Sequence, residues 1–285
     1  MEKLKIALQK SGRLSEKSQE MIREAGISLT NGKRNLVAQS SSFPIEVLYL
    51  RDDDIPQYVK DGVADIGIVG EDVFVESGKK LDLILRLGFS RCRLSLALPR
   101  RFNYTGIEWF QGKKIATSFP GILKKYLDEK GVDADIHEIS GSVEIAPAIG
   151  LADGICDIVS SGSTLVGNGL VEVERIMESE AVIIRSESLS QEKAMILENF
   201  LFRMQSVLAA RDNKYILLNA PNDKLEEIIS LLPGMKSPTV MPLFDPKWSS
   251  VHSVLNEKTF WSVIDKLKAA GAQGILVIPI EKMIL

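Results

Sequence analysis

The sequence contains few of the residues that usually bind metals or carry nucleophilic catalysis. Among its 285 residues are two cysteines, Cys92 and Cys156, and two histidines, His137 and His252. Each cysteine lies within an apolar strand pattern, so neither a disulfide framework nor a thiolate metal cluster is expected. With only two histidines, a histidine-rich zinc site and a Ser-His-Asp triad are also not expected. We interpret the cysteines as buried, reduced thiols and the histidines as packing or surface residues.

An excess of one charge and long apolar runs are also lacking. Lysine and arginine number 35 against 38 aspartates and glutamates, with no basic block that would neutralise a nucleic-acid backbone. No apolar window approaches membrane-spanning length, and the N-terminus leads into a short alternating strand instead of a signal peptide. We therefore expect neither nucleic acid nor a membrane as a partner, and a cytoplasmic location.

The pattern of the first 180 residues is typical of an α/β protein. Short strands alternate with helices, and we expect Ser15 to cap the first helix, with further helices at 52–62 and 143–154. Such alternation predicts mostly parallel sheets flanked by helices. At 285 residues the chain is long enough for two or three domains.

The last part of the chain follows a different pattern. An amphipathic helix is predicted over 190–213, and residues 215–285 read strand, helix, strand, strand, helix, strand. This βαββαβ order predicts a small ferredoxin-like domain, and its lack of acid–base or phosphate-binding groups favours ligand sensing or assembly. The expected domains are a first lobe of 1–90 plus 181–211, a second lobe of 91–180 and a C-terminal domain of 212–285.

The segment DGICDIVSSGSTLVGNG at 153–169 is the most informative stretch. It predicts a buried strand that runs into a turn of serines, a glycine and a threonine, where backbone N–H groups and hydroxyls converge as in phosphate sites. Asp157 lies near the end of the strand and could hold sugar hydroxyls or, through water, a magnesium ion. The segment lacks a Walker lysine and a GxGxxG pattern, so a simple hydrogen-bonded turn is the alternative.

An internal echo supports two similar lobes. DGVADIGIVG at 61–70 and DGICDIVSSG at 153–162 share aspartates, glycines and an isoleucine at five matched positions. Ligands of open α/β sheets lie beyond the carboxyl ends of strands, so the turns at Gly70 and Gly162 are expected to face one cleft. Asp-Gly before a strand is also common loop punctuation, which leaves coincidence as the alternative.

Five segments together resemble the long form of ATP phosphoribosyltransferase. In chain order they are QKSGRLSEKS, LRDDDIPQYVKDGVADIGIVGED, SGSVEIAPAIGLADGICDIVSSGSTLVGNGL, LPGMKSPTVMPL and GAQGILVIPIEKMI. The resemblance covers essentially the whole chain. It implies the first committed step of histidine biosynthesis, in which N1 of the adenine of ATP attacks C1 of phosphoribosyl pyrophosphate and releases pyrophosphate, with Mg2+ accompanying the leaving group.

The resemblance also carries expectations for the architecture. It implies an α/β fold with two catalytic lobes similar to type-II periplasmic binding proteins, followed by a C-terminal ferredoxin-like (ACT-like) domain. That domain is expected to bind histidine as a feedback inhibitor, and the chain to assemble as a homo-oligomer, from dimer to hexamer.

We expect the serine-rich turn to bind phosphoribosyl pyrophosphate. The residues for its 5-phosphate are Ser160, Ser161, Gly162, Ser163 and Thr164. Asp157, helped by Glu144, is predicted to bind the ribose hydroxyls. Glu144 could instead be a carboxylate favoured by the dipole of a helix start.

Cations after the first strand are expected to serve ATP or the leaving pyrophosphate. Lys10, Gly12 and Arg13 are assigned to ATP, and Lys10 and Arg13 join Asp157 and Glu144 as the predicted catalytic set. Ordinary surface charge is the alternative for Lys10 and Arg13.

Four further charged residues are assigned to the same substrates. Arg34 and Arg51 are expected to contact pyrophosphate, although Arg51 could pair with the neighbouring aspartates instead. Glu71 and Asp72 could contact the adenosine, and Asp72 and Asp157 are the candidate magnesium ligands. Helix N-capping is the competing role for Glu71 and Asp72.

In the C-terminal domain the segments that resemble the family's histidine-binding region contain Asn219, Met235, Thr239 and Gly274. Core packing is the alternative for Met235 and a tight turn for Gly274.

Two rival functions remain for the whole chain: a two-lobed effector-binding protein that closes on a phosphorylated ligand without reacting, and a phosphoribosyltransferase for another base.

Overall fold

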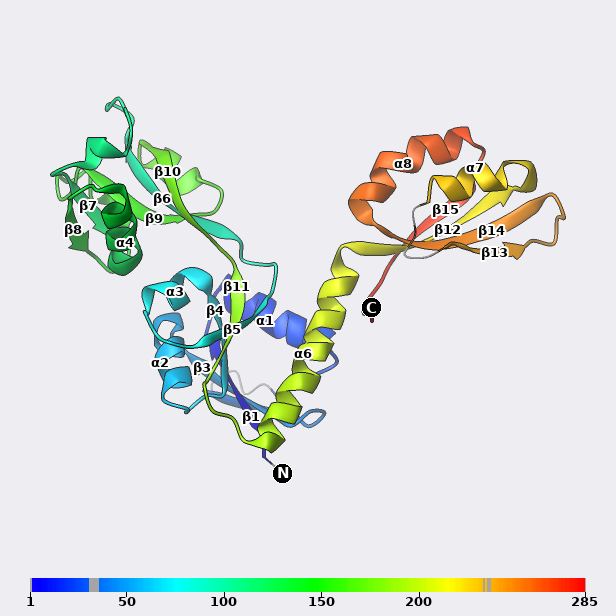
Figure 1. Ribbon diagram of the computed structural model, residues 1–285, viewed down its shortest axis with the longest axis horizontal. Coiled ribbons are helices and arrows are strands. Elements are labelled where there is room, and N and C mark those ends of the chain that lie inside the picture. The colour runs from blue at the N-terminus through cyan, green and yellow to red at the C-terminus, as the bar shows by residue number, and fades with distance from the viewer. Residues whose placement is uncertain (1, 31–35, 233, 235–236, 285) are drawn as a thin grey trace. The chain divides into compact units, whose positions relative to one another are not determined.

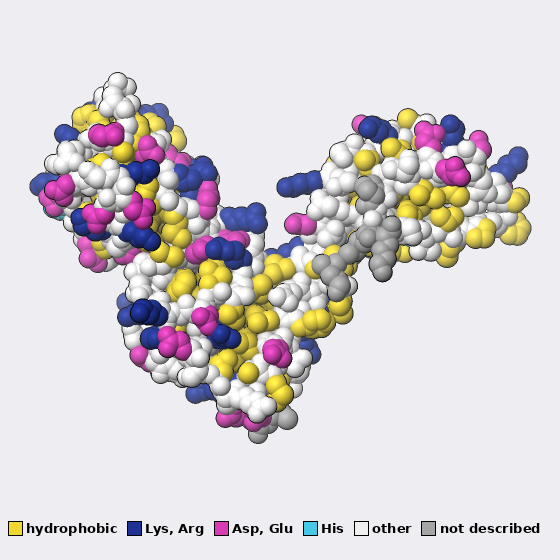
Figure 2. Space-filling model, in the orientation of Figure 1, with side chains coloured by type: hydrophobic (Ala, Val, Ile, Leu, Met, Phe, Trp, Pro, Cys, Tyr) yellow, Lys and Arg dark blue, Asp and Glu magenta, His cyan; other side chains and the backbone are white. Residues whose placement is uncertain are grey.

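The protein is described by a computed structural model that covers residues 2–30, 36–232, 234 and 237–284. Two compact units are present, Met1–Glu20 with Ile27–Leu197, and Met21–Gly26 with Glu198–Leu285. The first contains two sheets and the second contains one. Within the described ranges, no helix is both long enough and apolar enough to cross a bilayer. Figure 2 shows acidic and basic side chains interspersed over the visible face.

The first sheet has six strands in the order β2-β3-β1-β4-β11-β5. Strand β1 pairs in parallel with β3 and β4, whereas β2, β11 and β5 are antiparallel to their neighbours. The strands are β1 (Leu4–Gln9), β2 (Val37–Gln39), β3 (Ile45–Leu50), β4 (Ile66–Gly70), β5 (Asp82–Arg86) and β11 (Ala181–Arg185). The helices of this part are α1 (Arg13–Glu24), η1 (Asp52–Asp54), α2 (Ile55–Lys60) and α3 (Glu71–Glu76) (Figure 1).

The second sheet has five strands in the order β10-β6-β9-β7-β8. Strand β7 pairs in parallel with β8 and β9, and β6 is antiparallel to β9 and β10. The strands are β6 (Cys92–Pro99), β7 (Lys114–Thr117), β8 (Asp135–Glu138), β9 (Gly154–Val159) and β10 (Leu170–Ser179). The helices are η2 (Ile107–Phe110), α4 (Pro120–Lys130), η3 (Val143–Ile145) and α5 (Ser163–Gly167).

The two sheets share one topology. The order β3-β1-β4-β11-β5 in the first matches β8-β7-β9-β6-β10 in the second, and β4 and β9 occupy equivalent places. In each sheet the antiparallel strand beside β4 or β9 enters through a connection from the other sheet, β10 to β11 or β5 to β6. The sheets are therefore mixed, and the expectation of mostly parallel sheets was wrong. The local alternation of strands and helices in the sequence does not reveal that these two strands cross from one sheet to the other.

Two helix predictions fail for local reasons. Ser15 is not a cap, because α1 already begins at Arg13 and the Ser15 side chain is 1% exposed. The helix expected over 143–154 ends after the single 3-10 turn η3. Pro147 lacks the N–H that a helix needs, and Gly150 adopts a φ of 76°, outside the helical region.

The C-terminal sheet has the order β13-β14-β12-β15, with every pairing antiparallel. The elements are β12 (Asn213–Pro221), η4 (Asn222–Lys224), α7 (Leu225–Ser230), β13 (Thr239–Pro242), β14 (Trp248–Asn256), α8 (Glu257–Ala269) and β15 (Gln273–Pro279), preceded by α6 (Gln191–Arg211). Helices α7 and α8 lie over one face of the sheet, where Ile216, Leu218 and Phe260 form its core (Figure 1). The predicted α/β class and βαββαβ order are confirmed.

The cysteines and histidines have the modest roles expected of them, with one difference. Both thiols are free, and Cys156 is fully buried, but Cys92 is only partly so. Burial raises the pKa of the Cys92 thiol to about 11. His137 lies 3.0 Å from the carboxylate of Asp135, and His252 is hydrogen-bonded within the C-terminal sheet.

Candidate functional site

The turn after β9 presents a cluster of hydroxyls at its surface. Gly162, with a φ of 80°, is the N-cap of α5, a conformation that glycine adopts without strain. The Ser161 and Ser163 Oγ atoms lie 2.9 Å apart, and the Ser163 N–H donates to the Ser161 Oγ. The side chains of Ser160 and Thr164 are exposed as well. The structure thus gathers the five residues of the predicted phosphate turn into one hydroxyl-rich surface.

Asp157 lies on β9 just before this turn, and no lysine or arginine in the described part of the chain offsets its carboxylate. It accepts a 2.8 Å hydrogen bond from the N–H of Ile158. Burial raises the pKa of the Asp157 carboxyl, and the charge of Glu144 raises it further, while the Ile158 N–H lowers it. Glu144 in η3 is therefore close enough for its charge to act on Asp157. Its predicted role in binding the ribose stays a prediction.

One cavity of about 420 Å³ joins the carboxyl ends of β4 and β9. Gly70 and Ser160 both line it, so a part of each glycine turn reaches this space, whereas Ser161, Gly162, Ser163 and Thr164 are not among its lining residues. Arg13, Lys17 and Arg91 contribute basic side chains to its lining, and Asp52, Asp53 and Asp72 contribute acidic ones. The three basic residues can bind the phosphate groups of a ligand, while the three carboxylates offset their charge.

The predicted ATP residues after β1 take different places. Arg13 lines the cavity at the start of α1. Gly12, with a φ of 99°, makes the turn that leads into α1. Lys10 is exposed; its backbone N–H donates to the Leu50 carbonyl at 2.8 Å, and it does not line this cavity.

The two acidic residues that follow Gly70 are already engaged. Both carboxylate oxygens of Glu71 accept hydrogen bonds from Arg86. Asp72 is buried and accepts a 2.7 Å bond from the Ser179 hydroxyl, while its own N–H donates to the Ser179 oxygen. Burial raises the pKa of Asp72. Of the two, only Asp72 reaches the cavity.

Of the two arginines assigned to pyrophosphate, one belongs to the described residues. Arg51 is exposed and occupies the N-cap position of η1 without a side-chain capping bond, and its charge lowers the pKa of Asp53, which burial and the neighbouring Asp52 raise. No ion pair of Arg51 with an aspartate occurs among the described residues. Arg34 lies outside the described residues.

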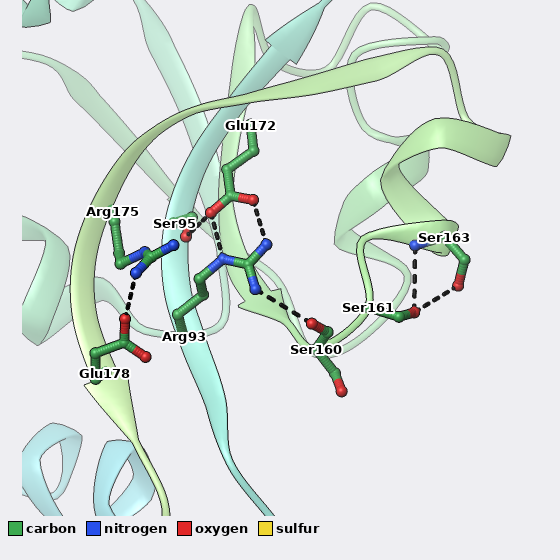
Figure 3. A network of polar contacts seen from close by, with 8 residues as sticks. All are labelled: Arg93, Ser95, Ser160, Ser161, Ser163, Glu172, Arg175 and Glu178. Carbon is green, nitrogen blue, oxygen red and sulfur yellow. Dashed lines mark hydrogen bonds and ion pairs between the residues drawn. The ribbon is translucent and has the colours of Figure 1, made fainter. Parts of the chain in front are cut away.

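Two residues with clear contacts were missed by the sequence prediction. Glu76 on α3 accepts hydrogen bonds from the N–H groups of Gly121 and Ile122, at 2.7 and 2.8 Å, and so caps α4. It borders a second cavity of about 520 Å³. Arg93 on β6 donates to the Ser160 carbonyl at 3.2 Å (Figure 3). An arginine inside an otherwise apolar strand was the available signal for Arg93.

In the C-terminal domain three of the four predicted residues can be placed. Asn219 on β12 pairs in register with Ser250 on β14 and Gln273 on β15. Gly274, with a φ of 58°, lies so close that a Cβ there would sit 3.3 Å from the Asn219 amide nitrogen. Thr239 begins β13 opposite His252. Met235 lies outside the described residues.

A dedicated metal cage is not evident in the described parts of the chain. These parts hold no group of three or more His, Cys, Asp or Glu side chains arranged for an ion. Mg2+ in phosphate chemistry is usually held by one or two carboxylates, with waters and substrate phosphates completing its shell. Asp157 offers one such carboxylate, so the residues fit a metal that arrives with its substrate.

Comparisons with known proteins identify the chain's relatives. The family model for ATP phosphoribosyltransferase matches residues 51–206, and that for the HisG C-terminal domain matches 210–282. ATP phosphoribosyltransferases of Phocaeicola vulgatus and Bacteroides fragilis are each 61% identical over 282 residues, covering 99% of this chain and 100% of theirs. That of Cytophaga hutchinsonii is 57% identical over 281 residues, 99% of this chain and 98% of its own.

A solved structure agrees with these relatives. The ATP phosphoribosyl transferase (HisG:HisZ) complex from Thermotoga maritima matches with a TM-score of 0.64 and 30% identity, covering 72% of this chain and 98% of that chain. The two family models together span both the two-sheet unit and the C-terminal domain. The chain therefore belongs to the ATP phosphoribosyltransferase family of pentosyltransferases of histidine biosynthesis, as its resemblance predicted.

Proposed function

We propose that this chain transfers the phosphoribosyl group of phosphoribosyl pyrophosphate to N1 of the adenine of ATP, giving phosphoribosyl-ATP and pyrophosphate. The observation that carries the proposal is the pairing of a hydroxyl-rich turn with Asp157 just before it, a carboxylate that no cation among the described residues offsets. Phosphate groups seek donors, and ribose hydroxyls seek acceptors. One phosphorylated ribose satisfies both at this spacing.

The reaction asks the protein mainly to hold two substrates in line and to stabilise the departing charge. Ser161, Ser163 and Thr164 hold the 5-phosphate through hydroxyls, while Asp157 and Glu144 accept hydrogen bonds from the ribose. Arg13 in the cavity wall supports this arrangement, because its guanidinium can bind phosphate oxygens in a bidentate manner.

The other residues assigned to ATP and pyrophosphate belong to the same proposal. Lys10, together with Arg51 and Arg34, attracts the polyphosphates of ATP and the leaving pyrophosphate. Asp72, which lines the cavity, is assigned to ATP. Glu71 keeps this role only if ATP displaces Arg86 from its carboxylate.

Magnesium completes the proposal as a companion of the pyrophosphate. Asp157 would hold it, directly or through water, and Asp72 is the weaker second ligand because burial and the Ser179 bond already commit its carboxylate. The ion would neutralise the phosphate charge that develops on departure.

The C-terminal domain is proposed to bind histidine and to lower activity when it does. Asn219 and Gly274 support this, since the glycine lets an amide side chain approach the backbone of β15. Thr239 and Met235 complete the proposed site. The domain limits 1–90 with 181–211, 91–180 and 212–285, the dimer-to-hexamer assembly and the cytoplasmic location belong to the same proposal.

Mixing ATP and phosphoribosyl pyrophosphate with the full chain tests the reaction. We expect pyrophosphate release that depends on both substrates and on Mg2+, with phosphoribosyl-ATP as the product. Free purines and pyrimidines offered in place of ATP should give none. Binding without pyrophosphate release would contradict the proposal and favour an effector-binding protein, whereas release with a free base would favour another phosphoribosyltransferase.

Histidine added to the same assay tests regulation. We expect inhibition in the wild type and reduced sensitivity in Asn219→Ala, with the rate in the absence of histidine unchanged, because Asn219 belongs to the separate C-terminal sheet. Equal histidine inhibition of both proteins would contradict the assignment of Asn219.

A further inference from the structure

Arg93 is held in one orientation by a carboxylate clamp. Its Nε and Nη2 atoms donate to the two carboxylate oxygens of Glu172 on β10, both at 2.5 Å. The Ser95 hydroxyl donates to the same carboxylate at 2.9 Å. A bidentate pair of this kind fixes the plane of the guanidinium as well as its position. Figure 3 shows the clamp beside the serine-rich turn.

The clamped guanidinium points one remaining N–H group at the turn. Its Nη1 donates to the carbonyl of Ser160, the first residue of the turn, at 3.2 Å. A peptide unit is planar and trans, so the Ser160 carbonyl and the Ser161 N–H point in opposite directions. A bond that fixes the carbonyl therefore also fixes where the Ser161 N–H is aimed.

The charge of Arg93 is already balanced within its own network. Arg93 lowers the pKa of Glu172, with the Ser95 hydroxyl assisting and partial burial opposing, so the pair stays ionised near neutral pH. A guanidinium committed to a carboxylate on one edge and to a carbonyl on another is a poor direct phosphate ligand. Its contribution to the turn is geometric.

We propose that Arg93, clamped by Glu172, is a positioning residue that sets the orientation of the Ser160–Ser161 peptide in the phosphate turn. This inference rests on the proposed function of that turn. It predicts that Arg93 governs the binding of the phosphoribosyl substrate through the turn and leaves the binding of ATP unchanged.

The test compares Arg93→Lys with a matched control. Lysine keeps the charge but cannot bind Glu172 and Ser160 through one rigid fork. We expect the KM for phosphoribosyl pyrophosphate to rise about tenfold, with the KM for ATP unchanged. The control is Arg175→Lys, because Arg175 pairs with Glu178 on β10 and makes no hydrogen bond to the turn in the described structure. It should leave both KM values as they are.

A second variant and a binding measurement keep the outcome decisive. Glu172→Gln retains Arg93 but weakens its clamp, and it should raise the KM for phosphoribosyl pyrophosphate less than Arg93→Lys does. Calorimetric titration with ribose 5-phosphate, without ATP, should show the same order of affinities. Circular dichroism and thermal unfolding establish that each variant is folded; if Arg93→Lys is not, Glu172→Gln decides.

The outcomes separate this inference from the function on which it rests. Wild-type affinity of the folded variants for both phosphorylated riboses would overturn the role of Arg93 alone. Equal increases in the KM values for both substrates would also overturn it, because they would indicate general damage. A wild-type protein that binds neither phosphorylated ribose would overturn the proposed function itself, and the positioning role with it.

Discussion

The turn after β4 and the turn after β9 follow equivalent strands in two sheets of the same order, and a glycine caps the helix after each turn. After Gly70 come two acidic residues, Glu71 and Asp72, and both carboxylates are already bonded. After Gly162 come Ser163 and Thr164, whose side chains are exposed. The same scaffold thus has a negative, internally satisfied helix start in one sheet and a neutral, accessible one in the other. Only the second is suited to an anion.

The two glycines differ in the reason for their smallness. Gly162 has a φ of 80°, which a larger residue would adopt only with strain. Gly70 has a φ of −65°, which any residue can adopt, but a Cβ there would lie 2.3 Å from the Asp72 Oδ1. One glycine shapes the backbone of the turn, and the other leaves room for a buried carboxylate.

The two aspartates matched in the repeat, Asp65 and Asp157, also differ in their contacts. Asp65 comes just before β4, and its carboxylate is bonded to Lys193 at 2.9 Å and to the Lys5 N–H at 2.8 Å. Asp157 lies near the carboxyl end of β9, and none of the described lysines and arginines pairs with it. The repeat aligns the helix caps but not the strands, because Gly70 ends β4 directly whereas Ser160 and Ser161 separate β9 from Gly162. Asp65 stabilises the fold, and Asp157 is the aspartate that we propose for a ligand.

The variant expected to have the largest effect is Thr164→Asp. It makes the neutral helix start after Gly162 acidic, as Asp72 makes the helix start after Gly70. A carboxylate facing a bound phosphate costs several kcal/mol, so kcat/KM for phosphoribosyl pyrophosphate should fall about a thousandfold. Stability should hold or rise by about 0.3 to 1 kcal/mol, because an acid suits a helix N-terminus. Steady-state kinetics and thermal unfolding measure both, with Thr164→Ser as the control. Near-normal kinetics in the aspartate variant would mean that no phosphate binds there.

Exchanging the two aspartates for asparagine tests which carboxylate acts on a ligand. Asp157→Asn should lower turnover about a hundredfold while the fold is retained, since the charge is lost and the shape kept. Asp65→Asn should leave turnover per folded molecule unchanged but cost about 1 to 3 kcal/mol of stability, because Lys193 loses its partner. Rates normalised to folded protein separate the two effects. Normal phosphoribosyl transfer by Asp157→Asn would defeat its assignment.

These differences also show which parts of the protein could be predicted from sequence. The turn at Gly162 and the βαββαβ order of the C-terminal domain depend on neighbouring residues, and both were predicted. The bond from Asp72 to Ser179 joins residues 107 positions apart, and that from Arg93 to Ser160 spans 67 positions. Such contacts depend on which strands become neighbours, and local patterns do not encode this.

The same limit explains the errors in the sheets. Strand β11 reaches the first sheet only after the chain has passed through the second, so alternation within the first ninety residues could not show that β4 has an antiparallel neighbour. The engagement of Glu71 by Arg86 depends on β5, which pairs with β11 and not with β4. The contacts of Glu71, which the sequence analysis assigned to ATP, therefore depend on a strand that returns from the second sheet.

Replacing each capping glycine by alanine should raise the KM for a different substrate in each turn. Gly162→Ala imposes strain of about 1 to 2 kcal/mol on the phosphate turn, so the KM for phosphoribosyl pyrophosphate should rise about tenfold. Gly70→Ala should displace Asp72 from Ser179, lowering the melting temperature and raising the KM for ATP. Kinetics with each substrate varied in turn measure the split. The same KM pattern in both variants would show that the turns do not serve different substrates.

The smallest expected effect concerns the carboxylate pair next to the phosphate turn. Burial raises the pKa of Asp157 and Glu144 adds to the rise, so the folded state binds this proton more tightly than the unfolded chain does, and this group contributes less stability as pH increases. If the ionised form binds ribose, kcat/KM for phosphoribosyl pyrophosphate falls on acidification at a pH above the ordinary aspartate value of about 3.9. Glu144→Gln removes one cause and leaves burial, so the acid limb should move down by less than about one pH unit. A pH–rate profile of both proteins measures the shift, and an acid limb that moved upward would refute the coupling between Glu144 and Asp157.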